Sequence, residues 1–416
     1  MNPLINGVFH VHFQPCCALI LCGVVFGCYQ PTQTNGNKAP SSINTNSESV
    51  KKEVTEALAI EFASELEQSI ANMDALRTDQ LVNMEFISEL AFREVEYPHQ
   101  VKQIYLDAAS KQSMFASLIE QVSNFGVYRF LKLKKVGNAY HPIFRLVGQN
   151  GGLSYHEFKL TPNSNGQPIA ADFYTTAVGT WSQGELVSNM MSQLHVRGES
   201  VEISDLGKLF LAHSSTFSKM LKAANTGEGL EEALEEFRNI PEKLYEDRRF
   251  LTMATSIASR ISQEELKVEV ERFNRYISDE SFLDPFLVDL LIRQEKADEA
   301  LEIIQRIDDR IGGDIFLDFH RANAFLASGR LEEAYDAVER VRISLPKIYA
   351  IYRTSMVVAA RRNDFQHVTR LLREIERNFD QAIDIDSIML DEELTDYVES
   401  SEFQKLKESV ESEASK

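Results

Sequence analysis

Arg145 and His156 are the residues of this chain whose side chains and surroundings best suit a binding site. They lie in the second and third of four segments in which apolar and polar residues alternate, which is the pattern of half-buried β-strands. These segments cover residues 127–136, 140–148, 153–161 and 168–178. Between them lie Gly137-Asn138, Asn150-Gly151 and Asn165-Gly166, dipeptides that suit tight hairpin turns. We therefore predict a four-stranded antiparallel meander.

If every dipeptide forms a two-residue loop, Arg145 faces His156 on the neighbouring strand, and His156 faces Thr175. The same predicted face carries the aromatic residues Tyr128, Phe130 and Phe173. An arginine and a histidine among aromatic rings predict a small-ligand pocket, because such pockets are mostly apolar with a few polar groups. In the alternative, both polar side chains are structural and bind backbone carbonyls. A one-residue shift of register would exchange the two faces.

Other catalytic and metal-binding motifs are absent from the sequence. It contains no glycine-rich phosphate loop, no paired-histidine zinc helix and no nucleophile elbow. All four cysteines lie between Cys16 and Cys28, so the rest of the chain offers no thiolate ligand and no cysteine nucleophile. The formal net charge of -20 disfavours nucleic-acid binding, which needs basic side chains opposite phosphates. We expect no enzyme activity, no metal and no cofactor.

The segment that ends at Cys28 predicts a lipid anchor. Residues 16–28 form an almost unbroken apolar run, which is too short to span a bilayer but suits the core of a signal peptide. The run ends in Val25-Phe26-Gly27-Cys28, which resembles the bacterial lipobox, and this resemblance implies that Cys28 receives the lipid. No Lys or Arg precedes Lys38, although export signals usually begin with basic residues. A cytoplasmic protein with an unrecognised leader is therefore the alternative.

Residues 29–49 predict a flexible linker behind this 1–28 leader. They are rich in Asn, Ser, Thr, Pro and Gly, and such a segment cannot bury enough apolar surface to order itself. An anchored cysteine on a flexible linker would hold the folded body outside the cytoplasm, on a membrane of a bacterial cell envelope.

The segment from 204 to 382 repeats itself. Its best copy contains Ala322, Phe325, Gly329, Ala334 and Pro346 at offsets that resemble the tetratricopeptide repeat. In that pattern small residues let two helices approach, Gly ends the first helix and Pro stops the second. Shifts by one repeat length reproduce the apolar positions, at Val288, Leu291, Ala300, Ile304 and Ile307 upstream and at Met356, Ala359, Val368, Leu372 and Ile375 downstream. We predict about five helical hairpins, with a non-repetitive helical bundle as the alternative.

The resemblance implies a concave groove lined by the first helix of each hairpin. The groove candidates are Arg293, Phe316, Phe319, Asn323, Arg353 and Arg361. Arginines beside aromatic rings predict a protein or peptide partner, with an acidic peptide as the best fit. In the alternative, these residues close the repeats onto a neighbouring domain.

Residues 50–195 predict an α+β domain in front of the repeats. Apolar residues recur with helical spacing over 54–70, 78–94 and 98–119. Three helices followed by the meander resemble the cystatin-like and nuclear-transport-factor-like roll, in which a curved sheet wraps a long helix. In enzymes with this roll a His–Asp pair can act as general base. Here the predicted register places His156 and Asp172 on opposite faces, with Asp172 opposite Lys159.

Residues 383–416 predict an acidic cap and tail. Tyr397 to Leu406 have the pattern of a short amphipathic helix, which suits the cap that a helical solenoid needs. The predicted fold class is therefore α+β, a cystatin-like roll followed by an all-α solenoid of the tetratricopeptide type. The predicted function is a non-catalytic, lipid-anchored protein-binding scaffold that resembles bacterial lipoproteins of unknown function. A ligand-binding or enzymatic roll, with its cavity near His156 and Arg145, is the alternative.

Overall fold

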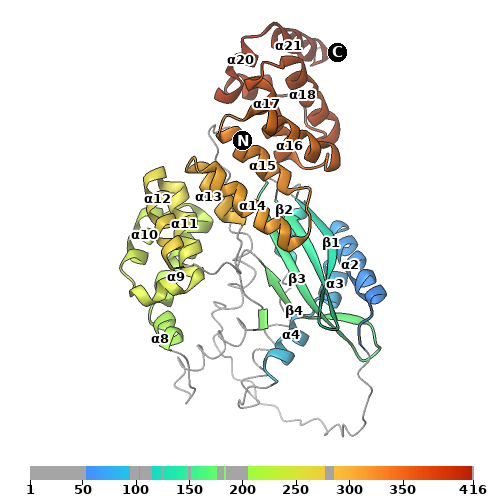
Figure 1. Ribbon diagram of the computed structural model, residues 1–416, viewed down its shortest axis with the longest axis vertical. Coiled ribbons are helices and arrows are strands. Elements are labelled where there is room, and N and C mark those ends of the chain that lie inside the picture. Colours follow the sequence, from blue (N-terminus) through green and yellow to red (C-terminus); the bar gives the residue numbers. More distant parts are fainter. Residues whose placement is uncertain are drawn as a thin grey trace.

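The computed structural model describes residues 53–93, 103, 115–123, 126–148, 151–175, 182–183, 205–276 and 285–414. The predicted leader, the linker over 29–49 and Cys28 lie outside the described residues. The described chain is a mixed fold, in which helices and a four-stranded antiparallel sheet precede a long helical region (Figure 1). The α+β class predicted from the sequence is confirmed at this level.

The N-terminal part contains helices α2 (Glu56–Ala71), α3 (Ala75–Leu81), α4 (Met84–Ala91) and α6 (Ala116–Ser123), and strands β1 (Val127–Val136), β2 (Ala139–Val147), β3 (Leu153–Pro162) and β4 (Pro168–Thr175). The first predicted helix is thus present as α2. The second is split into α3 and α4, because the Asn83 side chain accepts a hydrogen bond from the Phe86 amide and starts a new helix. Much of the third lies outside the described residues.

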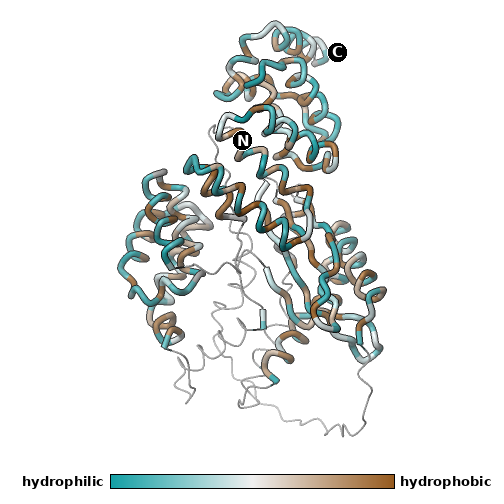
Figure 2. The backbone as a smooth tube through the Cα atoms, in the orientation of Figure 1, coloured by the Kyte–Doolittle hydropathy of each residue, from teal (hydrophilic) through white to brown (hydrophobic). Residues whose placement is uncertain are grey.

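The helical region contains α8 (Asp205–Ala212), α9 (Ser214–Thr226), α10 (Leu230–Arg238), η1 (Glu242–Glu246), α11 (Arg248–Ile261), α12 (Gln263–Tyr276), α13 (Pro285–Arg293), α14 (Ala297–Ile311), α15 (Leu317–Ala327), α16 (Leu331–Ser344), α17 (Tyr349–Arg361), α18 (Phe365–Phe379), α19 (Ile385–Met389), η2 (Glu392–Leu394), α20 (Thr395–Val398) and α21 (Ser401–Ala414). Most of these helices contact the next helix along the chain. Along the tube in Figure 2, hydrophilic and hydrophobic residues alternate within the helices, as amphipathic helices require.

The helical region has a regular period. Four helices, α12, α14, α16 and α18, begin at Gln263, Ala297, Leu331 and Phe365. These starting positions are evenly spaced by the length of one tetratricopeptide repeat, about 34 residues. Gly329 follows α15 with a φ of 73°, a conformation that ends a helix at little cost for glycine. Most of the apolar positions that the repeat pattern identified are buried, among them Ala300, Ala334 and Val368, and Phe325 is partly buried.

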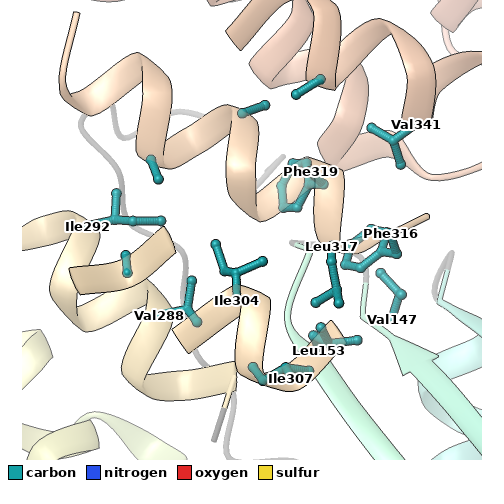
Figure 3. Packing of buried hydrophobic residues seen from close by; sticks show 14 of the residues in the cluster. Val147, Leu153, Val288, Ile292, Ile304, Ile307, Phe316, Leu317, Phe319 and Val341 are labelled. Atoms are coloured by element: carbon teal, nitrogen blue, oxygen red, sulfur yellow. The ribbon is translucent and has the colours of Figure 1, made fainter. Parts of the chain in front are cut away.

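The sheet has the order β1-β2-β3-β4, and each of its faces is covered. Its inner face packs against α2, α3, α4 and α6 through Tyr128, Phe144, Leu146, Phe158 and Phe173. Its outer face packs against the helical region through Ile143, Val147, Leu153 and Tyr155. Figure 3 shows Val147 and Leu153 beside Phe316, Leu317 and Ile307. The sheet is therefore the middle layer between two sets of helices.

The predicted strand register is confirmed in part. Lys132 pairs with Ile143, and Lys159 pairs with Asp172, as predicted. The predicted two-residue loop is present between β1 and β2, but between β3 and β4 it is wrong: Pro162 pairs with Pro168, and a bulge between Lys159 and Leu160 restores the predicted pair. Between β2 and β3 the prediction is wrong by one residue, because Arg145 pairs with Tyr155 rather than with His156. The reason is the turn: Gly148 donates to the carbonyl of Gly152 at 2.8 Å, which leaves three residues inside the loop instead of two.

The end of the chain packs onto α17 and α18. Tyr397, Phe403 and Leu406, from the predicted cap, are buried with Leu394 in one cluster against these two helices. The amphipathic pattern at Tyr397 to Leu406 covers two helices, α20 and α21, rather than one. Residues 385–414 thus cover the last hairpin.

Candidate functional site

Phe316 and Phe319, two of the groove candidates, lie at the contact between the sheet and the helical region. Phe316 is fully buried and Phe319 is 5% exposed. Gly151, in the loop after β2, has a φ of 82° and approaches so closely that an added Cβ would lie 2.7 Å from Phe319 Cε1. These two rings therefore line an intramolecular interface, where the sheet occupies the space that a peptide would need.

The same interface contains a buried ion pair. Arg145 on β2 pairs with Asp314 in the loop before α15, and their side chains are 2% and 1% exposed. The Tyr155 hydroxyl donates to the other carboxylate oxygen of Asp314 at 2.8 Å. The Arg145 guanidinium also lies over the Phe316 ring, 5.4 Å from its centroid. Two outer-face side chains of the sheet thus bind one carboxylate of the helical region.

Asp314 is itself held in place by the helical region. Its carboxylate accepts a hydrogen bond from the Phe316 amide at 3.0 Å, and its own amide donates to Asp308 at 3.0 Å. Asp308 accepts from Arg321 at 2.6 Å, and Arg321 also donates to Asp318 at 2.8 Å. These contacts within the helical region hold the carboxylate in the orientation in which the sheet binds it, and hydrogen bonds of this kind make a buried charge tolerable.

Burial raises the pKa of the Tyr155 hydroxyl well above its usual value, and the negative charge of Asp314 adds to this effect. Tyr155 therefore stays protonated and donates its hydrogen bond at any physiological pH. The interface keeps its hydrogen-bond donors under ordinary conditions.

The remaining groove candidates also make contacts within the chain. Asn323 accepts a hydrogen bond from the Thr354 hydroxyl at 3.0 Å. Arg353 donates to Asp391 at 2.9 Å, and Arg361 donates to Glu393 at 2.8 Å, so both bind the C-terminal cap. Burial lowers the pKa of Arg293, opposed by the charge of Asp289. The arginines that were expected to bind an acidic peptide thus include two that bind acidic residues of this chain.

His320 is a buried residue that the sequence pattern did not indicate as a site residue. It is 2% exposed, lies edge-on to the rings of Phe316 and Phe319, and places Nδ1 3.3 Å from the Asp289 carboxylate. Neither ring nitrogen has a hydrogen bond. Asp314 was missed as well, although an Asp after Gly312-Gly313 and before an apolar helix is a typical helix-capping signal.

The small-ligand candidates do not all lie together. Tyr128, Phe130, His156 and Phe173 share the inner face, whereas Arg145 lies on the outer face. The one-residue error between β2 and β3 moved Arg145, and a bulge between Phe130 and Lys132 returned the two β1 residues to the face of His156. The predicted Arg145–His156 pair is therefore wrong.

Aromatic rings fill much of the inner face around these residues. Tyr128 stacks on Phe144 with 5.0 Å between the ring centroids, and Phe173 lies 6.0 Å from Phe158. His156 Nδ1 lies 3.2 Å from the Tyr128 hydroxyl, and its Nε2 has no hydrogen-bond partner. Burial lowers the pKa of His156 to about 4, so the ring is neutral at physiological pH.

His156 and Asp172 lie on opposite sides of the sheet, as predicted, because Asp172 pairs with Lys159. Asp172 instead accepts hydrogen bonds from the Ser182 hydroxyl at 2.7 Å and the Gln183 amide at 3.0 Å. Among the residues that the structure describes, no group of three or more His, Cys, Asp and Glu side chains could hold a metal ion. Within the same residues, no helix has the length and apolarity to cross a membrane.

Comparison with models of known protein families, with curated proteins and with solved structures found no match to this chain.

Proposed function

We propose that this protein is a non-catalytic scaffold that binds another protein through a helical region of the tetratricopeptide type. The observation that carries the proposal is the even spacing of α12, α14, α16 and α18 by one repeat length. Helices stacked with such a period offer a long surface on which partner proteins bind. In this proposal the sheet supports one side of the stacked helices and does not bind the partner itself.

Two exposed apolar side chains of the helical region offer positions at which a partner can be detected. Ile343 on α16 is 71% exposed and Leu390 after α19 is 64% exposed, so a probe at either position is accessible. Leu76, in the N-terminal part, is 73% exposed and serves as a matched control.

Site-specific photo-cross-linking in cells tests this proposal. A photoreactive phenylalanine analogue would replace Ile343, Leu390 or Leu76, one position at a time. We expect one protein to be cross-linked at Ile343 or Leu390 and not at Leu76. The proposal fails if neither of the first two positions gives an adduct, or if all three give the same adducts.

We also propose that Cys28 carries a lipid that anchors the protein outside the cytoplasm. The lipobox-like Val25-Phe26-Gly27-Cys28 and the polar linker behind it support this proposal. Cys28→Ser should move the protein from the membrane fraction to the soluble fraction, whereas Cys22→Ser should leave it at the membrane. Identical fractionation of both variants and the parent would refute the anchor.

A second candidate function is the binding of a small uncharged ligand on the inner face. Nε2 of His156 lacks a partner, and the hydroxyls of Ser154 and Thr175 lie 3.5 Å apart beside it on the sheet. A neutral hydroxyl or amide group would satisfy this nitrogen. Native mass spectrometry of the protein purified from its host should then show a bound molecule that His156→Leu loses. A bare polypeptide mass in the parent would exclude this candidate.

A further inference from the structure

The interface between the sheet and the helical region contains a buried polar atom without a hydrogen bond. Eight buried side-chain nitrogen or oxygen atoms lack a hydrogen bond in the described part of the chain. Nε of Arg145 lies at this contact, and both ring nitrogens of His320 lie next to it, beside the rings of Phe316 and Phe319. Nε of Arg145 is shielded from water without gaining a hydrogen bond, so the docked state is less stable than its apolar contacts alone imply.

Each side of the interface also has a core that does not depend on the contact. The inner face of the sheet packs with α2, α4 and α6 in a cluster of its own. Further clusters lie within α8–α12 and within α17–α21. In the shared cluster only four of the twenty-four buried members come from the sheet, namely Ile143, Val147, Leu153 and Tyr155. Separation of the two sides would therefore leave most of either core in place.

The polar groups that hold the contact together are few. Arg145 and Tyr155 bind a single carboxylate, that of Asp314, from two neighbouring strands. A buried ion pair contributes little net stability compared with apolar packing. It does select one geometry, because any other docked geometry would leave a buried charge without its partner. Such a contact favours one docked arrangement and still permits separation.

We propose that the outer face of the sheet undocks reversibly from the helical region while both sides remain folded. In the docked form the sheet masks Phe316 and Phe319, and in the undocked form these rings and Asp314 become accessible. The sheet thus acts as a built-in occupant of the surface at which the sequence pattern predicted peptide binding. This inference does not depend on the proposed function, because undocking is measured without a partner.

Cysteine labelling at two adjacent residues of β2 tests the proposal. Val147 lies on the outer face and Leu146 on the inner face, and both are almost fully buried. In the full-length chain, Val147→Cys and Leu146→Cys would be labelled with a thiol reagent, and peptide mass spectrometry would quantify each site separately from the native cysteines. We expect the thiol of Val147→Cys to react about tenfold faster or more than that of Leu146→Cys, because local opening costs less free energy than unfolding.

A second pair of cysteine variants controls for the cavities that the smaller cysteine side chain leaves at Val147 and Leu146. Ala350→Cys on α17 lies at the outer contact, beside Gly151, and Ala170→Cys lies on the inner face. The thiol of Ala350→Cys should again react faster than that of Ala170→Cys. Equal rates within both pairs would overturn the proposal, because the two faces would then open only when the domain unfolds.

Tyr155→Phe provides the last arm, since it removes one hydrogen bond of the contact and leaves the ring. Combined with Val147→Cys it should accelerate labelling several-fold, because the docked form loses a hydrogen bond that the undocked form does not make. Tyr397→Phe is the matched control, because its hydroxyl bonds Thr369 at 2.8 Å in the C-terminal cap. The proposal is also overturned if the two tyrosine variants have the same effect on labelling of Val147→Cys.

Discussion

The two faces of the β-sheet are buried by different means. The inner face joins helices and strands of the N-terminal part and uses aromatic rings, such as Phe62, Phe144 and Phe158, with a neutral histidine among them. The outer face joins Arg145 to Asp314, 169 residues further along the chain, and uses charge as well as apolar contact.

This difference separates two tasks. Apolar packing on the inner face holds the N-terminal part together, and it tolerates small adjustments because dispersion and burial are not directional. The charged contact on the outer face is directional, since the guanidinium and the phenol must meet one carboxylate. The inner face thus determines whether the domain folds, and the outer face determines how it sits on the helices.

The largest effect is expected from Asp314→Ala. It leaves Arg145 as a buried charge without its partner, which should lower the free energy of unfolding by about 3–5 kcal/mol. Asp298→Ala removes a carboxylate that is 93% exposed and should change stability by less than about 1 kcal/mol. Urea unfolding of both variants measures the difference. Similar midpoints would mean that the outer face does not depend on this charge.

The inner face should respond to acid through His156. Its pKa is about 4 in the folded protein against 6.5 for an ordinary histidine, so the unfolded chain binds the proton more readily. Stability from this group is complete above about pH 6.5 and falls as the pH drops toward 4, by about 3 kcal/mol in all. Unfolding curves between pH 7 and 4 should show this loss, and His156→Gln should lack that part of it. An unchanged pH profile in the variant would contradict the assignment.

Gly151→Ala, at the interface, should lower the stability of the protein more than Gly137→Ala, at an exposed turn. Gly137 and Gly151 both have positive φ, so an alanine strains the backbone at either position by about 1–2 kcal/mol. At Gly151 the new methyl group also collides with Phe319, which should add about 1–3 kcal/mol. Gly137→Ala has no neighbour within 4 Å and controls for the backbone term. Thermal unfolding compares the stability of the two variants. Equal losses of stability would show that the loop after β2 can move away from Phe319 at no energetic cost.

The smallest expected difference is between two tyrosines, one on each face. Tyr155→Phe removes a hydrogen bond to a carboxylate and should cost about 2 kcal/mol, while Tyr128→Phe removes one to a neutral imidazole and should cost about 1 kcal/mol. Chemical denaturation with several repeats resolves such a gap. A larger loss at Tyr128 would reverse the comparison between the faces.

Local patterns in the sequence predicted much of this fold. The alternation in β1 and the Gly137-Asn138 turn gave the first hairpin, and Lys159 was placed opposite Asp172 as the structure has it. The spacing by one repeat length placed α14, α16 and α18 in one series. These features depend on residues within a few turns or strands of each other, where periodicity is informative.

The candidate sites were predicted less well. A single additional residue in the loop after Gly148 moved Arg145 to the other face of the sheet, and alternation alone cannot detect such a shift. Phe316 and Phe319 were predicted either to bind a peptide or to close the repeats onto a neighbouring domain, and the packing agrees with the second, because the sheet of the same chain covers them. No local pattern in the sequence indicates which apolar face of a helix meets which sheet.

The sequence by itself determined the element types, the order of strands and the period of the helices. These follow from residue spacing, turn-forming glycines and helix caps, which act over short distances along the chain. Only the tertiary structure decided that Arg145, Tyr155 and Asp314 meet, and that His156 is buried without a partner for Nε2. The contacts to Asp314 arise from the packing of segments far apart in the sequence, where apolar area, shape and charge must match together.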